Sequence, residues 1–163
     1  MSLTRLALLA FVPVFAPGAH AADLDLLPSV LGVTERMQAQ TLSGFALDGF
    51  DPVTYFLPGG PKPGHAHFET EWRGVAWRVA TEANREAFLR SPETYAPRLG
   101  GHDPMAALAG RVVEAQPGLF AVVNMRLYLF RNAMSQREFL ADPATAARAE
   151  ERWNELRNQL VQP

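Results

Sequence analysis

The sequence of 163 residues contains no cysteine, and this absence excludes several kinds of structure and chemistry. Without thiols the chain has no disulfide framework, no lipid-attachment thiol and no thiolate site for Cu(I) or structural Zn. Its stability must therefore come from an ordinary apolar core. A hydrophobic content of 48% is sufficient to form one.

Clusters of positive charge are also missing. The chain has 15 Lys and Arg against 17 Asp and Glu, a formal net charge of −2, and no basic run. Because a phosphate backbone is bound by concentrated positive charge, we expect no nucleic-acid partner.

Long apolar runs are absent apart from Leu6–Phe15 near the N-terminus. This run is shorter than the roughly 20 residues of a membrane-spanning helix. It follows the positive segment Met1–Arg5 and precedes Ala19-His20-Ala21, a small-x-small cleavage site. A buried N-terminal helix is the alternative, but prolines interrupt it. We predict a signal peptide over residues 1–21, a periplasmic location and no membrane span after cleavage.

The remaining chain contains a series of residues that occurs twice. Gly49-Phe50-Asp51-Pro52 recurs 52 positions later as Gly101-His102-Asp103-Pro104. At an offset of 51, the aligned features are Trp77 with Tyr128, Phe88-Leu89 with Phe139-Leu140, and Pro92 with Pro143. A collinear series of this kind indicates an internal duplication. We predict a lead-in over residues 22–46 and a single domain over 47–163, with diverged copies at 47–97 and 99–147.

Each copy has the pattern of a β-hairpin followed by a helix. In the first copy, Phe68–Trp72 and Val75–Val79 are predicted strands, and Thr81 is the predicted N-cap of a helix that ends near Ser91-Pro92. The corresponding features of the second copy are Phe120–Val123, Arg126–Phe130, Asn132 and Asp142-Pro143. Both substitutions at the caps keep a side-chain oxygen, which favours the alignment.

The last predicted element is an amphipathic helix from about Pro143 to Leu160. Its apolar residues recur every three or four positions and share one face: Ala146, Ala149, Trp153, Leu156 and Leu160. This face is expected to join the core, and Glu151, Glu155 and the arginines are expected to be solvated. The predicted fold class is α+β, with two tandem β-β-α units and a C-terminal amphipathic helix.

One series of spaced residues carries a resemblance to a known family. It begins with Asp51-Pro52-Val53 and continues with Trp72, Gly74, Trp77, Val79, Thr81, Phe88, Pro92 and Tyr95. This series resembles the YHS domain family over residues 44–97, and residues 99–147 look like a diverged version of the same unit. The resemblance implies a YHS-like fold and a binding role.

Some members of this family are implicated in metal sensing or trafficking through cysteine thiolates. The resemblance places the thiol positions on Thr54, Ala80 and Asn84 in the first copy and on Ala106, Arg131 and Ser135 in the second. His102-Asp103 stands where related exported members often carry Tyr-Cys. The resemblance therefore implies an inherited fold without the thiolate chemistry.

Histidines remain as candidate metal ligands. His65 and His67 are two residues apart, and an extended segment turns such side chains to the same side. Together with His102 and Asp103, or with Glu69, they make a candidate site for Cu(II), Zn or Ni. The alternative is that the pair is exposed and unconstrained after a Pro/Gly loop.

The two Asp-Pro pairs have a structural interpretation. Asp51-Pro52 and Asp103-Pro104 each follow a glycine, where an aspartate bonds nearby backbone N–H groups in a turn. His102-Asp103 can also be read as an acid–base pair, but Phe50-Asp51 has no histidine. No catalytic nucleophile is indicated, and we predict that the protein is not an enzyme.

Two functional hypotheses follow. The first is a non-enzymatic periplasmic YHS-type binding module for a metal ion or a small ligand, the latter in a cleft between the two copies. The alternative is a protein-interaction domain without such a ligand, using the loop at residues 58–64 or the C-terminal helix. The expected partner is therefore a small ligand or an unknown protein.

Overall fold

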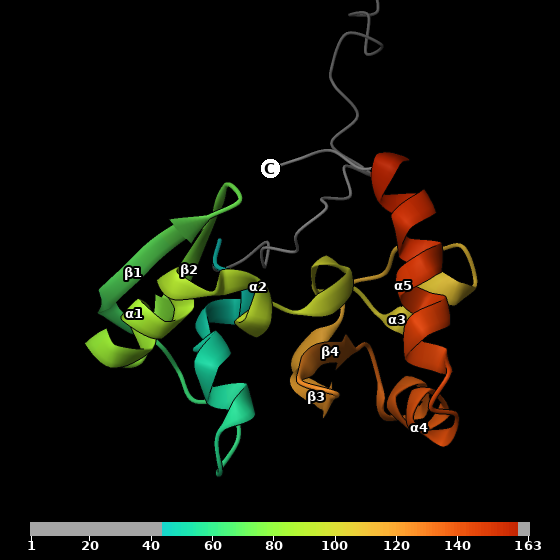
Figure 1. The fold of residues 1–163 in the computed structure, drawn as a ribbon, viewed down its shortest axis with the longest axis horizontal. Helices are drawn as coiled ribbons and strands as arrows, with labels where there is room; N and C mark the ends of the chain where they lie inside the picture. The colour runs from blue at the N-terminus through green and yellow to red at the C-terminus, as the bar shows by residue number, and fades with distance from the viewer. Residues whose placement is uncertain (1–43, 160–163) are drawn as a thin grey trace, which may run out of the picture. The chain divides into compact units, whose positions relative to one another are not determined.

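The computed structural model describes residues 44–159, which form two β-hairpins, each followed by helices (Figure 1). The first half contains β1 (His65–Trp72), β2 (Val75–Val79), α1 (Glu82–Arg90) and α2 (Pro92–Tyr95), preceded by the 3₁₀ turns η2 (Leu47–Gly49) and η3 (Pro52–Phe56). The second half contains η4 (Arg98–Gly101), α3 (Pro104–Leu108), β3 (Gln116–Val123), β4 (Arg126–Phe130), α4 (Ala133–Ala141), α5 (Thr145–Leu156) and η5 (Arg157–Gln159). The α+β class is thereby confirmed. The predicted signal peptide and residues 22–43 of the lead-in lie outside the described residues.

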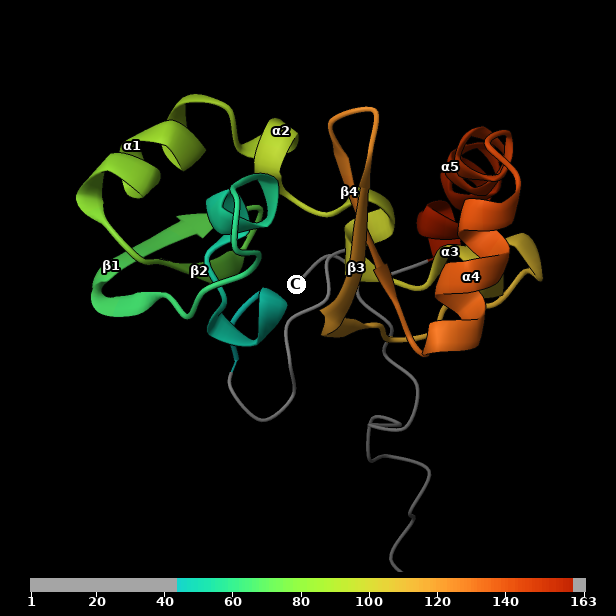
Figure 2. The ribbon, with the colours of Figure 1, turned by 90° about the horizontal axis from the view of Figure 1, so that it is seen from below.

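The two hairpins are separate two-stranded antiparallel sheets (Figure 2). Their strands pair in the same register. In the first, Trp72 pairs with Val75 and Glu69 with Arg78, after which the register shifts. In the second, Val123 pairs with Arg126 and Phe120 with Leu129, followed by a shift at the same place. Each of these residues differs by 51 from its counterpart, so the β-bulges also correspond.

Left-handed backbone closes both hairpins. Arg73 and Gly74 have φ of 54° and 75°, and Asn124 and Met125 have φ of 51° and 58°. Two consecutive positive φ values are typical of type I′ turns, which match the twist of the strands. Asn and Gly tolerate this conformation, whereas Arg73 and Met125 adopt it at a steric cost.

Predicted caps start the helix after each hairpin. The Thr81 hydroxyl accepts a hydrogen bond from the N–H of Asn84 at 3.1 Å, and the side-chain Oδ1 of Asn132 accepts one from the N–H of Ser135 at 2.9 Å. The C-terminal helix begins two residues later than predicted, at Thr145, because the Asp142 carboxylate accepts the N–H of Ala144 and holds this segment in a turn. Its α-helical part ends at Leu156, earlier than predicted, and a 3₁₀ turn follows.

Strand β4 lies between two parts of the core. Leu127 and Leu129 pack with the inward side chains of β2, whereas Tyr128 and Phe130 pack with the helices of the second half. Ala149, Trp153 and Leu156 of α5 are buried in that second cluster, as their spacing predicts, and Ala146 packs against it. Because both faces of β4 are covered, its side chains after Arg126 are all buried.

Tyr55 links the two halves of the chain. Its ring meets the edge of Phe120 at 5.0 Å between centroids, and its hydroxyl donates to the carbonyl of Pro117 at 3.1 Å. Within residues 44–159, no helix has the length and apolarity needed to cross a membrane.

Candidate functional site

The carboxylate of Asp51 is completely buried and is used for hydrogen bonds within the fold. Its Oδ1 accepts the N–H of Val53 at 2.8 Å, which caps the turn that begins at Pro52. Its Oδ2 accepts the N–H of Ala80 at 2.8 Å and the Nδ2 of Asn84 at 2.6 Å. Asp51 therefore ties the Asp-Pro turn to the end of β2 and the first turn of α1.

Asp103 makes the corresponding bonds in the second half. It is also completely buried, and its Oδ1 accepts the N–H of Ala106 at 2.8 Å, capping the helix that begins at Pro104. Its Oδ2 accepts the N–H of Arg131 at 2.8 Å and the hydroxyl of Ser135 at 2.5 Å. Five of the six positions that the YHS resemblance marks for thiols thus supply donors to these carboxylates: Ala80, Asn84, Ala106, Arg131 and Ser135. In the first half, Thr54 adds a bond from its hydroxyl to the Asp51 carbonyl.

The candidate metal ligands lie in different surroundings. His65 and His67 are exposed on β1, with nearly parallel rings whose centroids are 6.4 Å apart. His102 is buried, and its ring packs on Trp153 at 5.3 Å between centroids. In the described part of the chain, no group of three or more His, Asp and Glu side chains is arranged to hold a metal ion. The structure therefore does not gather His65, His67, His102 and Asp103 into one site.

A cleft of about 820 Å³ lies where the first hairpin, the connection between the halves and α5 meet. The first hairpin contributes Trp72, Arg73 and Gly74, α2 contributes Glu93, and the connection with η4 contributes Ala96, Pro97, Arg98, Leu99 and Gly100. The residues from α5 and η5 are Glu150, Trp153, Asn154, Arg157 and Asn158. The cleft thus combines charged side chains, amides and two indole rings, and its size suits a small organic ligand.

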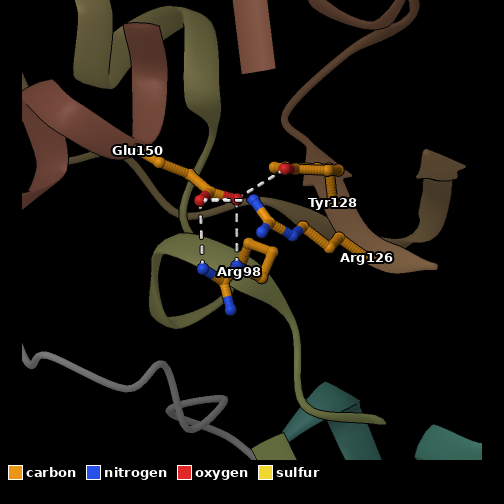
Figure 3. Close-up of polar contacts among 4 residues, drawn as sticks. All are labelled: Arg98, Arg126, Tyr128 and Glu150. Atoms are coloured by element: carbon orange, nitrogen blue, oxygen red, sulfur yellow. Dashed lines mark hydrogen bonds and ion pairs between the residues drawn. The ribbon is translucent and has the colours of Figure 1, made fainter. Parts of the chain in front are cut away.

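One wall of this cleft is a network centred on Glu150 (Figure 3). Arg98, from η4, donates through Nε to Oε1 and through Nη2 to Oε2, each at 3.0 Å. From β4, Arg126 donates to Oε2 at 2.9 Å, and the Tyr128 hydroxyl donates to Oε1 at 2.6 Å. The paired, parallel bonds from Arg98 give the geometry that a guanidinium makes best with a carboxylate.

This network changes the acid–base behaviour of its members. Burial opposes ionisation of Glu150, but the hydrogen bonds from Arg98 and Tyr128 and the charges of Arg98 and Arg126 outweigh it and lower its pKa. Burial, followed by the hydrogen bond to the Glu150 carboxylate, raises the pKa of Tyr128 to about 12. Glu150 is therefore held as a carboxylate and Tyr128 as a neutral phenol at neutral pH.

The aromatic part of the cleft is formed by the two indoles. Trp72 is half-buried, and the guanidinium of Arg73 lies 4.4 Å from its ring centroid. Arg73 in turn pairs with Glu93 at 3.2 Å, an exposed contact. Trp153 is buried except for 8% of its surface, so it supplies only an edge to the cleft.

Sequence reasoning did not find this network. Arg98 and Glu150 are 52 residues apart and in no recognisable motif, and Glu150 lies beside the glutamates that were expected to be solvated. The only signal was indirect: a tyrosine in a buried strand requires a partner for its hydroxyl. The ligand cleft between two copies stays a prediction, because only Leu99 and Gly100 of the observed lining belong to the predicted second copy.

No family model matches the chain, and no curated protein or solved structure matches it either. Its function is therefore inferred from the geometry of the cleft.

Proposed function

We propose that this protein is a non-enzymatic binding module that holds a small organic ligand in the cleft between β1–β2, η4 and α5. The observation that carries this proposal is the cleft itself, with its volume of about 820 Å³ and its mixture of guanidinium, amide and indole groups. Concave sites that combine flat apolar surface with a few convergent polar groups are typical of ligand binding.

The proposal includes a YHS-type fold made of two diverged copies and export to the periplasm. It is supported by the matching hydrogen bonds of Asp51 and Asp103 and by the identical registers of the two hairpins. The cleft is lined by residues of the first copy, by residues 98–100 where the two copies would meet, and by residues 150–158, which follow the second copy. Export is supported by the sequence pattern of residues 1–21 alone.

A binding role is favoured over catalysis by the state of the carboxylate in the cleft wall. Glu150 accepts four hydrogen bonds, two of them from Arg98, and its pKa is lowered. A general base needs an open acceptor and a pKa near the working pH. Glu150 has neither property and instead fixes α5 against η4 and β4.

The test is a thermal-shift screen of the mature protein against a fragment library of acids, bases and neutral compounds. Asn154 is exposed on α5 and lines the cleft, so Asn154→Trp fills the cleft without altering the core. Glu151, exposed on the same helix and outside the lining, gives the matched control Glu151→Trp. We expect hits that stabilise the wild type and E151W but not N154W. An empty screen, or hits that persist in N154W, would refute the proposal.

A second candidate function is metal binding at His65 and His67. It is carried by the side-by-side position of their rings on the exposed face of β1. Titration with Cu(II), Zn(II) and Ni(II) is expected to give saturable binding that His67→Ala abolishes. Equal binding by the wild type and H67A would exclude this candidate.

A further inference from the structure

We infer that the ligand of this cleft is a small organic anion with a planar body, bound by the guanidinium groups of Arg98 and Arg73. This inference rests on the proposed function, because it names the chemical class of ligand for the same cleft. Its basis is a difference in hydrogen-bonding capacity: Glu150 has no acceptor position left, whereas Arg98 and Arg73 still have free N–H donors.

The partly buried carboxylate of Glu150 has no acceptor position left for a cationic ligand. Each oxygen of Glu150 accepts two hydrogen bonds: Oε1 from Arg98 and Tyr128, and Oε2 from Arg98 and Arg126. A carboxylate offers about four acceptor positions in total. A ligand ammonium group would therefore have to displace an arginine or the tyrosine in order to bond Glu150.

The arginines, in contrast, have donors to spare. A guanidinium carries five N–H groups. Arg98 donates through Nε and Nη2 to Glu150, and Arg73 donates through Nη2 to Glu93. At least one Nη group of each remains for a ligand, and planar carboxylate or phosphoryl oxygens match this geometry.

The apolar surface of the cleft restricts the shape of the ligand. The half-buried indole of Trp72 adds flat apolar surface, which favours a planar body over a flexible chain, and Trp153 adds an apolar edge.

The charge dependence can be measured with three probes that share one ring system: 2-naphthoate, 2-naphthamide and 2-naphthylmethylamine. Isothermal titration calorimetry at low salt and neutral pH gives their affinities for the mature protein. We expect naphthoate to bind at least about tenfold more tightly than naphthamide, since a hydrogen bond to a charged group contributes more than 1.4 kcal/mol. The amine should bind most weakly, and added salt should weaken naphthoate binding alone.

Charge variants separate a binding role from a structural one. Arg98→Gln and Arg126→Gln each remove one arginine from Glu150, but only Arg98 lines the cleft. R98Q is expected to lower naphthoate affinity about tenfold or more, and R126Q to leave it within about threefold because its charge is not at the cleft surface. Arg73→Gln and Glu93→Gln each break an exposed ion pair, so both variant proteins should fold normally. R73Q should weaken binding, and E93Q should strengthen it by releasing Arg73.

Failure of this inference is distinguishable from failure of the proposed function. Equal or tighter binding of the amide or the amine, blocked by N154W but not by E151W, would overturn the anionic ligand and keep the binding cleft. The anionic ligand would also be overturned by two results together. R98Q and R126Q would change naphthoate affinity equally, and R73Q and E93Q would not change it in opposite directions. Naphthoate binding that persists in N154W would place the probe outside the cleft and overturn both.

Discussion

Asp51 and Asp103 hold the same three kinds of hydrogen bond at corresponding places in the two halves of the chain. Each caps its own turn, accepts the N–H of the residue that follows the hairpin, and accepts a side-chain donor from the next helix. Both carboxylates are completely buried. Each therefore joins its Asp-Pro turn to a hairpin end and a helix start that follow between 28 and 33 residues later, and the stability of each half depends on it.

We predict that Asp51→Asn destabilises the protein by about 3 kcal/mol. The amide nitrogen of the new side chain would face the donors of Ala80 and Asn84, so two bonds would be lost and two buried donors left unpaired. The matched variant Asn84→Ala removes only one donor and should cost about 1 kcal/mol. Urea unfolding followed by circular dichroism measures both. A D51N protein within about 0.5 kcal/mol of the wild type would show that the carboxylate is not an anchor.

Local patterns were sufficient to predict the hairpins and the helix starts. Alternating apolar residues place Val75, Trp77 and Val79 on one buried face, and Thr81 and Asn132 cap the helices as expected. Their physical causes lie within a few residues of one another, so they can be read from sequence. The late start of α5 is the exception, because Asp142 bonds Ala144 and delays the helix.

The lining of the cleft could not be predicted in this way. Arg98 meets Glu150 because η4 and α5 are packed together, and nothing in the local sequence of either element indicates that contact. The same limit applies to the histidines. Spacing alone suggested that His65 and His67 share a side, but only the fold determines that His102 is buried against Trp153 instead of joining them.

Gly64 is a position where a side chain cannot be accommodated. A Cβ there would lie 2.5 Å from the carbonyl carbon and the Cβ of Arg78, so the backbone of β2 would have to move. Gly64→Ala is therefore expected to cost about 2 kcal/mol. Gly118, in β3, has nothing within 4 Å of the same added atom, and Gly118→Ala should be neutral or slightly stabilising. Equal thermal stability of the two variants would contradict this reading of the contact.

The lowered pKa of Glu150 predicts a loss of stability in acid. A carboxylate whose folded pKa lies below its ordinary value of 4.5 contributes stability above that value, and this contribution is lost as the pH falls through the folded pKa. Glu150→Gln removes the titrating group and should cost about 2 kcal/mol near pH 6. The difference in free energy of unfolding between wild type and E150Q should shrink as the pH falls below about 4. A difference that is constant with pH would show that Glu150 does not titrate with folding.

The raised pKa of Tyr128 predicts a second loss of stability, in alkali. Burial and the Glu150 carboxylate disfavour the phenolate, so the folded pKa of about 12 exceeds the ordinary value of 10.0. Between these values the unfolded chain has released the proton and the folded chain still holds it, so unfolding is favoured progressively as the pH rises. Tyr128→Phe loses the hydrogen bond to Glu150 and is expected to be less stable than the wild type at neutral pH by about 1–2 kcal/mol. It also lacks the titrating hydroxyl, so this deficit should narrow between about pH 10 and pH 12. Urea unfolding of both proteins across that range measures the difference, and a deficit that widens with pH would contradict the assignment.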